Sequence, residues 1–287
     1  MPNWYTHRDL LKASIGLEGS ATGAHTQLDA VLEGVAREID RFVGFHFYPA
    51  SGVRYYTPKN STCLDLGYPL TALDAVALDT DGNASYNSTL TTTDYYLIPY
   101  NATEESPKRP FWAIELAVNS TAAFPRATQR GARITGTWGY YNQTAAVNVA
   151  LTTTLAATAT QAEVTNSSLL HPGQTVLIDS EQVFVVRNGK SGSDTATSSG
   201  IVGIERAKNG TTAAAHATTG VALSVYEYPV VDKASLYQSE MDYRANAAPL
   251  GFTGGLDGGG QTLSPGAGGL HPFTRRTLEQ FRVAVAR

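Results

Sequence analysis

Apolar residues in the N-terminal part of the chain recur with the spacing of an α-helix. The series Leu28, Val31, Leu32, Val35, Ile39, Phe42 and Val43 advances in steps of three and four. This spacing predicts a helix over residues 26–44 with one apolar face, which must pack on other elements. A shorter helix is predicted over residues 6–16, because Thr6 and Asp9 have the spacing of a capping box and Gly16 suits a helix end.

Short stretches with a period of two follow these helices. The clearest lies between Arg130 and Tyr140, where apolar and small residues occupy every second position. That alternation predicts a strand with one buried face. Further strands are predicted over residues 53–57, 62–66, 73–79, 86–90, 95–98 and 112–118, with Asp81-Gly82 as a hairpin turn. Residues 1–145 therefore predict helices followed by a small antiparallel β-sheet.

The composition changes after residue 144. Residues 144–161 contain no charged residue, and their periodicity leaves a linker and a plain strand pair both open. Strands are predicted over residues 175–178, 182–186, 201–206 and 222–226, so that residues 146–228 form an inserted all-β domain. Helical spacing returns after Pro229 with Val230, Ala234, Tyr237 and Met241 on one face, which predicts a closing helix within residues 229–250.

Residues 251–287 combine a glycine-rich stretch with a basic end. Nine of the nineteen residues from Gly251 to Gly269 are glycine. The segment after them carries several arginines against the single acid Glu279. We predict a flexible leash that ends in a docking element rather than a core element. The expected fold class is α+β, with an inserted all-β domain and an extended C-terminal tail.

Charge and cysteine content exclude several classes of protein. The formal net charge is -4 and charged residues make up 16 % of the chain, so no global positive field draws it to DNA phosphates. Cys63 is the only cysteine, which excludes an intrachain disulfide and a cysteine-rich zinc site. No segment approaches the ~20 apolar residues of a membrane span, and early charges argue against a secretory signal. We expect a soluble chain made in the cytoplasm.

Candidate catalytic residues are few. Asp179 and Glu181 are two apart and would share one face of a strand, as a pair for acid–base chemistry requires. The favoured interpretation is a pair of surface acids at a hairpin, because the sequence supplies no pocket for them. The six histidines are scattered without helical metal-ligand spacing, and there is no Gly-x-Ser-x-Gly elbow. No cofactor, metal site or catalytic residue is therefore predicted.

Aromatic residues are the other candidates for binding. They could form a platform that stacks on sugars or bases, or they could form the helix-to-sheet core and a subunit contact. The second interpretation is favoured, with Phe42 as a further core residue. The set is Phe45, Phe47, Tyr48, Tyr55, Tyr56, Tyr95, Tyr96, Tyr140 and Tyr141.

Several segments occur in a characteristic order. They are AREIDRFVGFHFYP, VRYYTP, LDTDGN, DYYLIPYNA and FPRATQRGARITGTWGYY in residues 1–142, then YPVVDKASLYQSEMDYRANAAPLGF and HPFTRRTLEQFR after residue 228. As an ordered set they resemble the head-to-tail connector, or adaptor, family of long-tailed bacteriophages. That family usually passes almost directly from strand to closing helix, whereas here residues 146–228 intervene. Through LIDSEQVFVV and GIERAKNGTTAAAHATTGVAL, this insert resembles a small β module of phage structural proteins.

The resemblance implies a non-enzymatic protein of the virion neck. Such proteins form a ring, typically of twelve copies, beneath the portal, and double-stranded DNA passes through its lumen without sequence recognition. The implied partners are further copies of the chain, the portal protein, and a stopper or tail-terminator protein below. The candidate portal-docking residues are Arg275, Arg276, Phe281, Arg282 and Arg287, and the candidate subunit-interface residues are Arg37, Asp40, Arg41 and Arg133. The insert would decorate the outer rim, so a short linker in place of residues 150–227 should leave ring assembly intact.

Two other classes of function stay open from the sequence. A carbohydrate-binding or adhesin-like β protein of a virion would use the tyrosines as its binding platform. A hydrolase would use Asp179 and Glu181 as its carboxylate pair.

Overall fold

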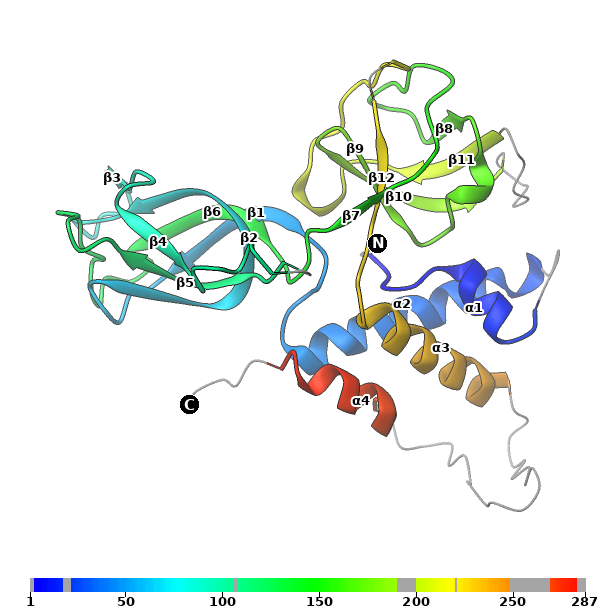
Figure 1. Ribbon diagram of the computed structural model, residues 1–287, viewed down its shortest axis with the longest axis horizontal. Helices are drawn as coiled ribbons and strands as arrows, with labels where there is room; N and C mark the ends of the chain where they lie inside the picture. The colour runs from blue at the N-terminus through cyan, green and yellow to red at the C-terminus, as the bar shows by residue number, and fades with distance from the viewer. Residues whose placement is uncertain are drawn as a thin grey trace.

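The structure is a computed structural model that describes residues 3–17, 22–105, 108–189, 200–219, 221–247 and 269–282. Within these ranges the chain forms a group of helices and two antiparallel sheets (Figure 1). The helices lie together in the lower part of Figure 1, the first sheet extends to one side, and the second sheet lies above the helices. The expected mixture of helices with antiparallel sheets is therefore confirmed.

The longest helix matches its predicted apolar face. The helices are α1 (Arg8–Ser14), α2 (His25–Val43), α3 (Val231–Ala247) and α4 (Pro272–Glu279). In α2, the residues Leu28, Leu32, Val35, Ala36, Ile39 and Val43 are buried. The helix ends where Gly44 adopts a left-handed backbone with φ of 90°, a conformation that glycine takes without strain.

The cap of α1 differs from the prediction. The residue before the helix is His7, and its side chain accepts a hydrogen bond from the backbone N–H of Leu10. The Thr6 hydroxyl is buried without a hydrogen-bond partner among the described residues. The prediction of Thr6 as the capping residue was therefore wrong by one position.

The first sheet has the strand order β1-β6-β2-β5-β4, with β3 on the end of β2. Its strands are β1 (Ala50–Tyr56), β2 (Cys63–Leu78), β3 (Ser88–Thr89), β4 (Tyr95–Ile98), β5 (Phe111–Leu116) and β6 (Ala132–Trp138). Burial alternates along β6 as predicted. The two strands predicted over residues 62–66 and 73–79 are one long strand, β2, whose pairing with β5 shifts register between Asp65 and Leu70. Ile114, Phe124 and Ile134 lie in the core of this sheet.

The second sheet has the order β7-β12-β9-β10-β11-β8. Its strands are β7 (Thr144–Ala146), β8 (Gln161–Val164), β9 (Thr175–Ile178), β10 (Glu181–Asn188), β11 (Gly200–Glu205) and β12 (Leu223–Tyr226), with short 3-10 turns at Ser167–Leu169 and Lys208–Gly210. The four predicted strands are present. For residues 144–161, where a linker and a strand pair were both open, the structure has β7 at the start of the stretch and β8 at its end. A core of its own, including Val164, Val176 and Val183, fills this unit.

The second sheet is also joined to the helices by side-chain packing. Phe184 of β10 meets Trp4 edge to face, with ring centroids 5.4 Å apart. It completes a buried cluster with Leu11 of α1 and Leu28 and Leu32 of α2. Removing an accessory domain on the rim would leave that cluster intact. Here the second sheet contributes Phe184 to the cluster, so removing the sheet would open the cluster.

Backbone contacts strengthen the same junction. The N–H of Arg8 donates to the carbonyl of Pro172 at 3.0 Å, and the side-chain amide of Gln182 donates to the carbonyl of Pro49 at 3.0 Å. A Cβ atom on Gly210 would lie 2.3 Å from the Ser51 carbonyl oxygen, so only glycine permits this approach. The N-terminal segment and β1 thus hold the second sheet in place.

Helix α4 folds onto the other helices of the same chain. Leu270, Leu278 and Phe281 are buried in the core that α2 and α3 share. The Phe281 ring packs edge to face on Phe47 at 5.2 Å and on Tyr140 at 5.0 Å. Phe281 is thus a core residue of this chain, which corrects its assignment to portal docking. Arg287 and residues 251–268 lie outside the described residues.

Helix α3 begins one residue later than its predicted face. Val230 precedes the helix and is 41 % exposed, whereas Val231 is fully buried. The buried face of α3 also contains polar residues, since Ser235, Gln238 and Ser239 are enclosed between helices.

Candidate functional site

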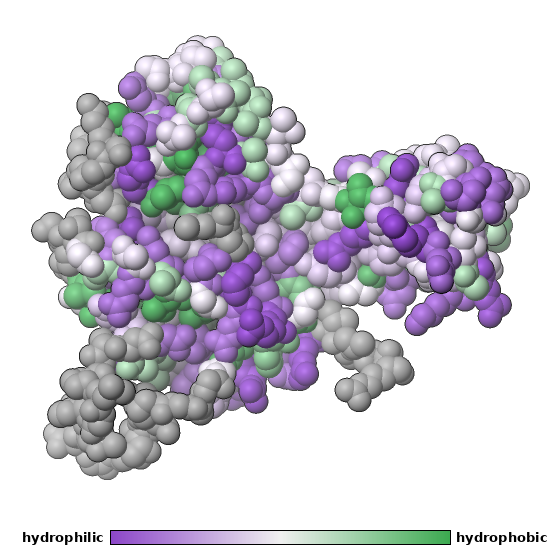
Figure 2. All heavy atoms as spheres, turned by 180° about the vertical axis from the view of Figure 1, so that it is seen from behind, coloured by the Kyte–Doolittle hydropathy of each residue, from purple (hydrophilic) through white to green (hydrophobic). Residues whose placement is uncertain are grey.

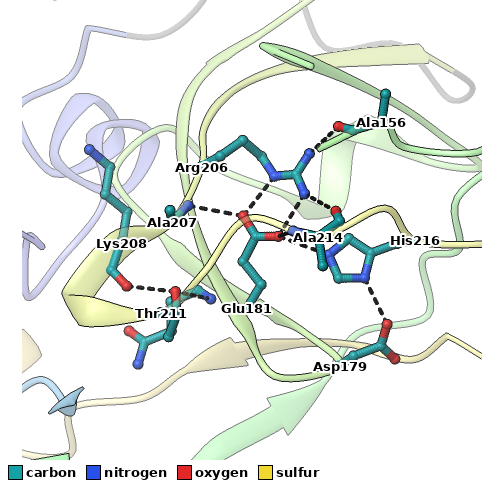
Figure 3. Close-up of polar contacts among 10 residues, drawn as sticks. Ala156, Asp179, Glu181, Arg206, Ala207, Lys208, Thr211, Ala214 and His216 are labelled. Carbon is teal, nitrogen blue, oxygen red and sulfur yellow. Dashed lines mark hydrogen bonds and ion pairs between the residues drawn. The ribbon is translucent and has the colours of Figure 1, made fainter. Parts of the chain in front are cut away.

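The densest polar cluster of the described residues surrounds Glu181 at the start of β10 (Figure 3). Its carboxylate is 1 % exposed and accepts two hydrogen bonds from Arg206, at 2.7 Å from Nε and 2.6 Å from Nη2. It also accepts from the backbone N–H groups of Ala207 at 2.9 Å and Ala214 at 3.1 Å. The prediction that Glu181 is a surface acid was therefore wrong.

His216 links the two acidic residues. Its Nε2 lies 2.9 Å from Glu181 and its Nδ1 lies 2.7 Å from Asp179. The Asp179 side chain is half exposed, so for this residue the predicted surface position is confirmed. His216 lies in the stretch TTAAAHATTG, where every other residue is small. A single histidine among such residues is the feature of the sequence that could have indicated a buried polar partner.

Arg206 extends the cluster to a further loop. Its guanidinium donates to the carbonyl oxygens of Ala156 and Ala214, both at 2.5 Å. The cluster therefore ties together stretches of chain that have little regular secondary structure of their own. A bidentate arginine–carboxylate pair has a fixed geometry, which suits it to hold such loops in one arrangement.

The electrostatics of Glu181 favour a structural role. Burial acts to raise the pKa of Glu181, but hydrogen bonds from Arg206, His216 and two backbone amides outweigh it and lower the pKa to about 2. A carboxylate whose pKa is lowered and whose lone pairs are occupied by donors is a poor base for a proton from a substrate. The geometry thus supports an internal clamp rather than the carboxylate pair of a hydrolase.

A second histidine cluster lies at the junction between α1 and the second sheet. The His7 and His171 rings stack with centroids 4.3 Å apart, and His171 Nδ1 lies 2.8 Å from Asp9. Burial, followed by repulsion from His171, lowers the pKa of His7 to about 4. The sequence shows Asp179 and Glu181 as a pair, but the other partners in both clusters lie far apart along the chain and could not be assigned from it. Among the described residues no group of histidine, cysteine and acidic side chains is arranged to hold a metal ion.

Two of the predicted subunit-interface residues are engaged within the chain. Arg37 forms an ion pair with Asp40 at 3.0 Å and donates to the backbone carbonyl of Asn3 at 2.9 Å. Asp40 also accepts a hydrogen bond from the Tyr5 hydroxyl. Burial raises the pKa of Asp40 to about 6. The N-terminal segment thus contacts both side chains, whereas Arg41 is exposed, and the role of these residues in a subunit interface stays a prediction.

Three of the predicted docking arginines form a basic surface that also contains the exposed Glu279, whose carboxylate lies 3.6 Å from Arg282. Arg275, Arg276 and Arg282 are exposed on or beside α4, and we call them the basic patch of α4. The guanidinium carbons of Arg275 and Arg282 lie 5.9 Å and 5.6 Å from the ring centre of Phe42. The patch therefore rests on an aromatic support next to the core.

Of the nine residues of the suggested aromatic platform, three are buried, four are half-buried and two are exposed. Phe45, Phe47 and Tyr141 are buried in the core between the helices and the first sheet, which confirms the core interpretation for them. Tyr55 and Tyr96 are 43 % and 57 % exposed. In Figure 2 the first sheet, at the right of the view, presents a mainly hydrophilic surface with small apolar spots.

Comparisons with known proteins add no assignment. Among the described residues, no helix combines the length and apolarity needed to cross a bilayer. No protein-family model matches the chain, and no curated protein or solved structure shows a significant match to it.

Proposed function

We propose that the chain is a structural, non-enzymatic adaptor of a long-tailed bacteriophage. Copies of it join into a ring beneath the portal, connect the capsid to the tail, and let double-stranded DNA pass. The observation that carries the proposal is the basic patch of α4 on a chain whose net charge is -4. The ordered set of adaptor-like segments supports the same assignment.

The packing of α4 suits a docking element. Leu278 and Phe281 fix the helix on the core, while the arginines of the patch face outward. A preformed helix loses less conformational entropy on binding than a free tail does. Complementary charge on a partner then sets specificity and association rate. An acidic rim on the portal protein is the partner surface that this arrangement fits.

A charge-reversal experiment tests portal docking. The triple change Arg275→Glu, Arg276→Glu and Arg282→Glu should weaken binding to the purified portal protein at least tenfold at about 0.15 M salt, since like charges then face each other. The fold should persist, because all three side chains are exposed and, among the described residues, the one ion pair lost is Arg282 with Glu279, at 3.6 Å on the surface. Co-sedimentation and negative-stain images measure binding, and circular dichroism measures folding.

The matched control is Lys233→Glu, which reverses an exposed cation on α3. Its portal binding should equal that of the unchanged chain. Unchanged binding in the triple variant would contradict the proposal. Deleting residues 271–287 is a poorer test, because it also removes Leu278 and Phe281 from the core.

A carbohydrate-binding function is the second candidate. The exposed rings of Tyr96 and Tyr100 meet edge to face at 6.1 Å beside Glu115, which are residue types that sugar sites use. Binding to a glycan array by a monomer that forms no ring on the portal would favour it.

A further inference from the structure

One exposed face of the first sheet carries two arginines that stack on tyrosines. The guanidinium carbon of Arg130 lies 3.9 Å from the ring centre of Tyr55, and that of Arg133 lies 4.7 Å from the ring centre of Tyr86. The two tyrosine rings are 5.8 Å apart. We call these four residues the Arg–Tyr patch.

The Arg–Tyr patch is held in shape by local hydrogen bonds. The Tyr86 hydroxyl donates to the carbonyl of Arg130 at 2.9 Å, and the N–H of Arg130 donates to the Thr57 hydroxyl at 3.1 Å. Within the part of the chain that the structure describes, neither guanidinium has a carboxylate at ion-pair distance. A stacked guanidinium keeps its in-plane N–H groups available. The patch is therefore ready to meet an anionic surface.

A second exposed patch lies at the other end of the strand order. Tyr96 of β4 and Tyr100 are 57 % and 63 % exposed, and the Tyr100 hydroxyl donates to Glu115 of β5. We call these three residues the Tyr–Glu patch. Glu104 is exposed in the loop after β4, and the neighbouring Arg109 is already paired with Glu105 at 2.5 Å. Lys108 is also exposed in this loop, so Glu104, Glu105 and Glu115 stand against Lys108 and Arg109, and the patch with its loop carries a net charge of -1.

We infer that the Arg–Tyr patch of one copy binds the Tyr–Glu patch of the next copy. The inference rests on the proposed function, since it supplies the contact between neighbours in the ring. The two patches differ: Tyr55 and Arg133 lie on β1 and β6, Tyr96 and Glu115 lie on β4 and β5, and β2 separates these two pairs of strands in the sheet. A contact between two different surfaces is head to tail, which is the kind that closes into a ring.

Composition and charge favour a second copy over DNA as the occupant. Tyrosine and arginine dominate the binding energy of protein interfaces. Both patches have exposed tyrosines, and their charges are opposite. DNA phosphates would account for the arginines but would leave the Tyr–Glu patch without a partner.

Charge exchange between two variants tests the contact. The first variant carries Arg130→Glu and Arg133→Glu, and the second carries Glu104→Lys and Glu115→Lys. On the purified portal protein, each variant alone should lose at least nine-tenths of its rings, because like charges meet at every contact. An equimolar mixture should restore them, because reversed patches then face each other. Negative-stain particle counts and mass photometry measure the rings.

Other outcomes separate the inference from the proposed function. Rings from either variant alone, or no rescue in the mixture although both variants give the circular dichroism of the unchanged chain, would overturn the contact. Intact rings with weakened duplex-DNA binding in the first variant would assign the Arg–Tyr patch to DNA and also overturn it. Absence of rings from the unchanged chain would instead refute the proposed function. If either double variant fails to fold, Tyr100→Ala replaces it, because Tyr100 is exposed. Ring formation by Tyr100→Ala equal to that of the unchanged chain would also overturn the contact.

Discussion

Replacing Glu181 by glutamine is expected to lower the free energy of unfolding by about 3 kcal/mol at neutral pH. The change keeps the shape of the side chain but removes its charge, and Arg206, whose side chain is 8 % exposed, then lies buried without its counter-ion. The carbonyl and amide contacts to Ala156 and Ala214 would lose their support. Urea denaturation followed by circular dichroism measures the effect.

The matched control is Asp179→Asn. Asp179 contacts the same histidine, but its side chain is half exposed, so its loss should cost less than about 1 kcal/mol. Its backbone φ is 53°, and asparagine tolerates this region better than most residues. Equal costs for the two changes would show that Glu181 is not the centre of the cluster.

The difference in the free energy of unfolding between the unchanged chain and Glu181→Gln should change with pH in a defined direction. The pKa of Glu181 is lowered from 4.5 to about 2 in the folded chain, so its carboxylate stabilises the fold fully above about pH 4.5. That contribution is lost as the pH falls from about 4.5 to about 2. The difference in stability between the unchanged chain and Glu181→Gln should therefore shrink over this range. A constant difference would contradict the ionised assignment.

The parts of the fold that sequence predicts correctly are those whose cause is local. The steps of three and four that begin at Leu28 give α2, and Gly44 ends it because glycine takes a left-handed backbone at no cost. Alternation in β6 gives its buried face. The division of β2 into two strands failed because the chain changes partners without leaving the sheet, which no local pattern records.

The polar contacts could not be predicted from the sequence, because they join residues that only the tertiary fold brings together. The donors to Glu181 come from positions 25 to 35 residues away along the chain. Arg37 and Asp40 look like outward-facing helix residues until Asn3 and Tyr5 are placed beside them. Conversely, Arg275 and Arg276 could be found from the sequence, since exposed like charges on a short helix need no partner to be recognised.

Shortening Phe184 to alanine is expected to lower the free energy of unfolding by about 3–5 kcal/mol, because it empties a buried ring-sized space. Phe184 is 2 % exposed and shares its cluster with Trp4 and with leucines of α1 and α2. The control Leu169→Ala, at a 41 % exposed position in the same unit, should cost less than about 0.5 kcal/mol.

The same packing predicts the result of removing the second sheet. A short linker in place of residues 150–227 would expose Trp4 and Leu28, two residues that the sheet covers through Phe184. We therefore expect aggregation or a lowered unfolding midpoint rather than the tolerance that an accessory domain allows. Thermal melts and size-exclusion chromatography measure it. A soluble linker variant that keeps the midpoint of the full chain would show that the helices and the first sheet hold their core without Phe184.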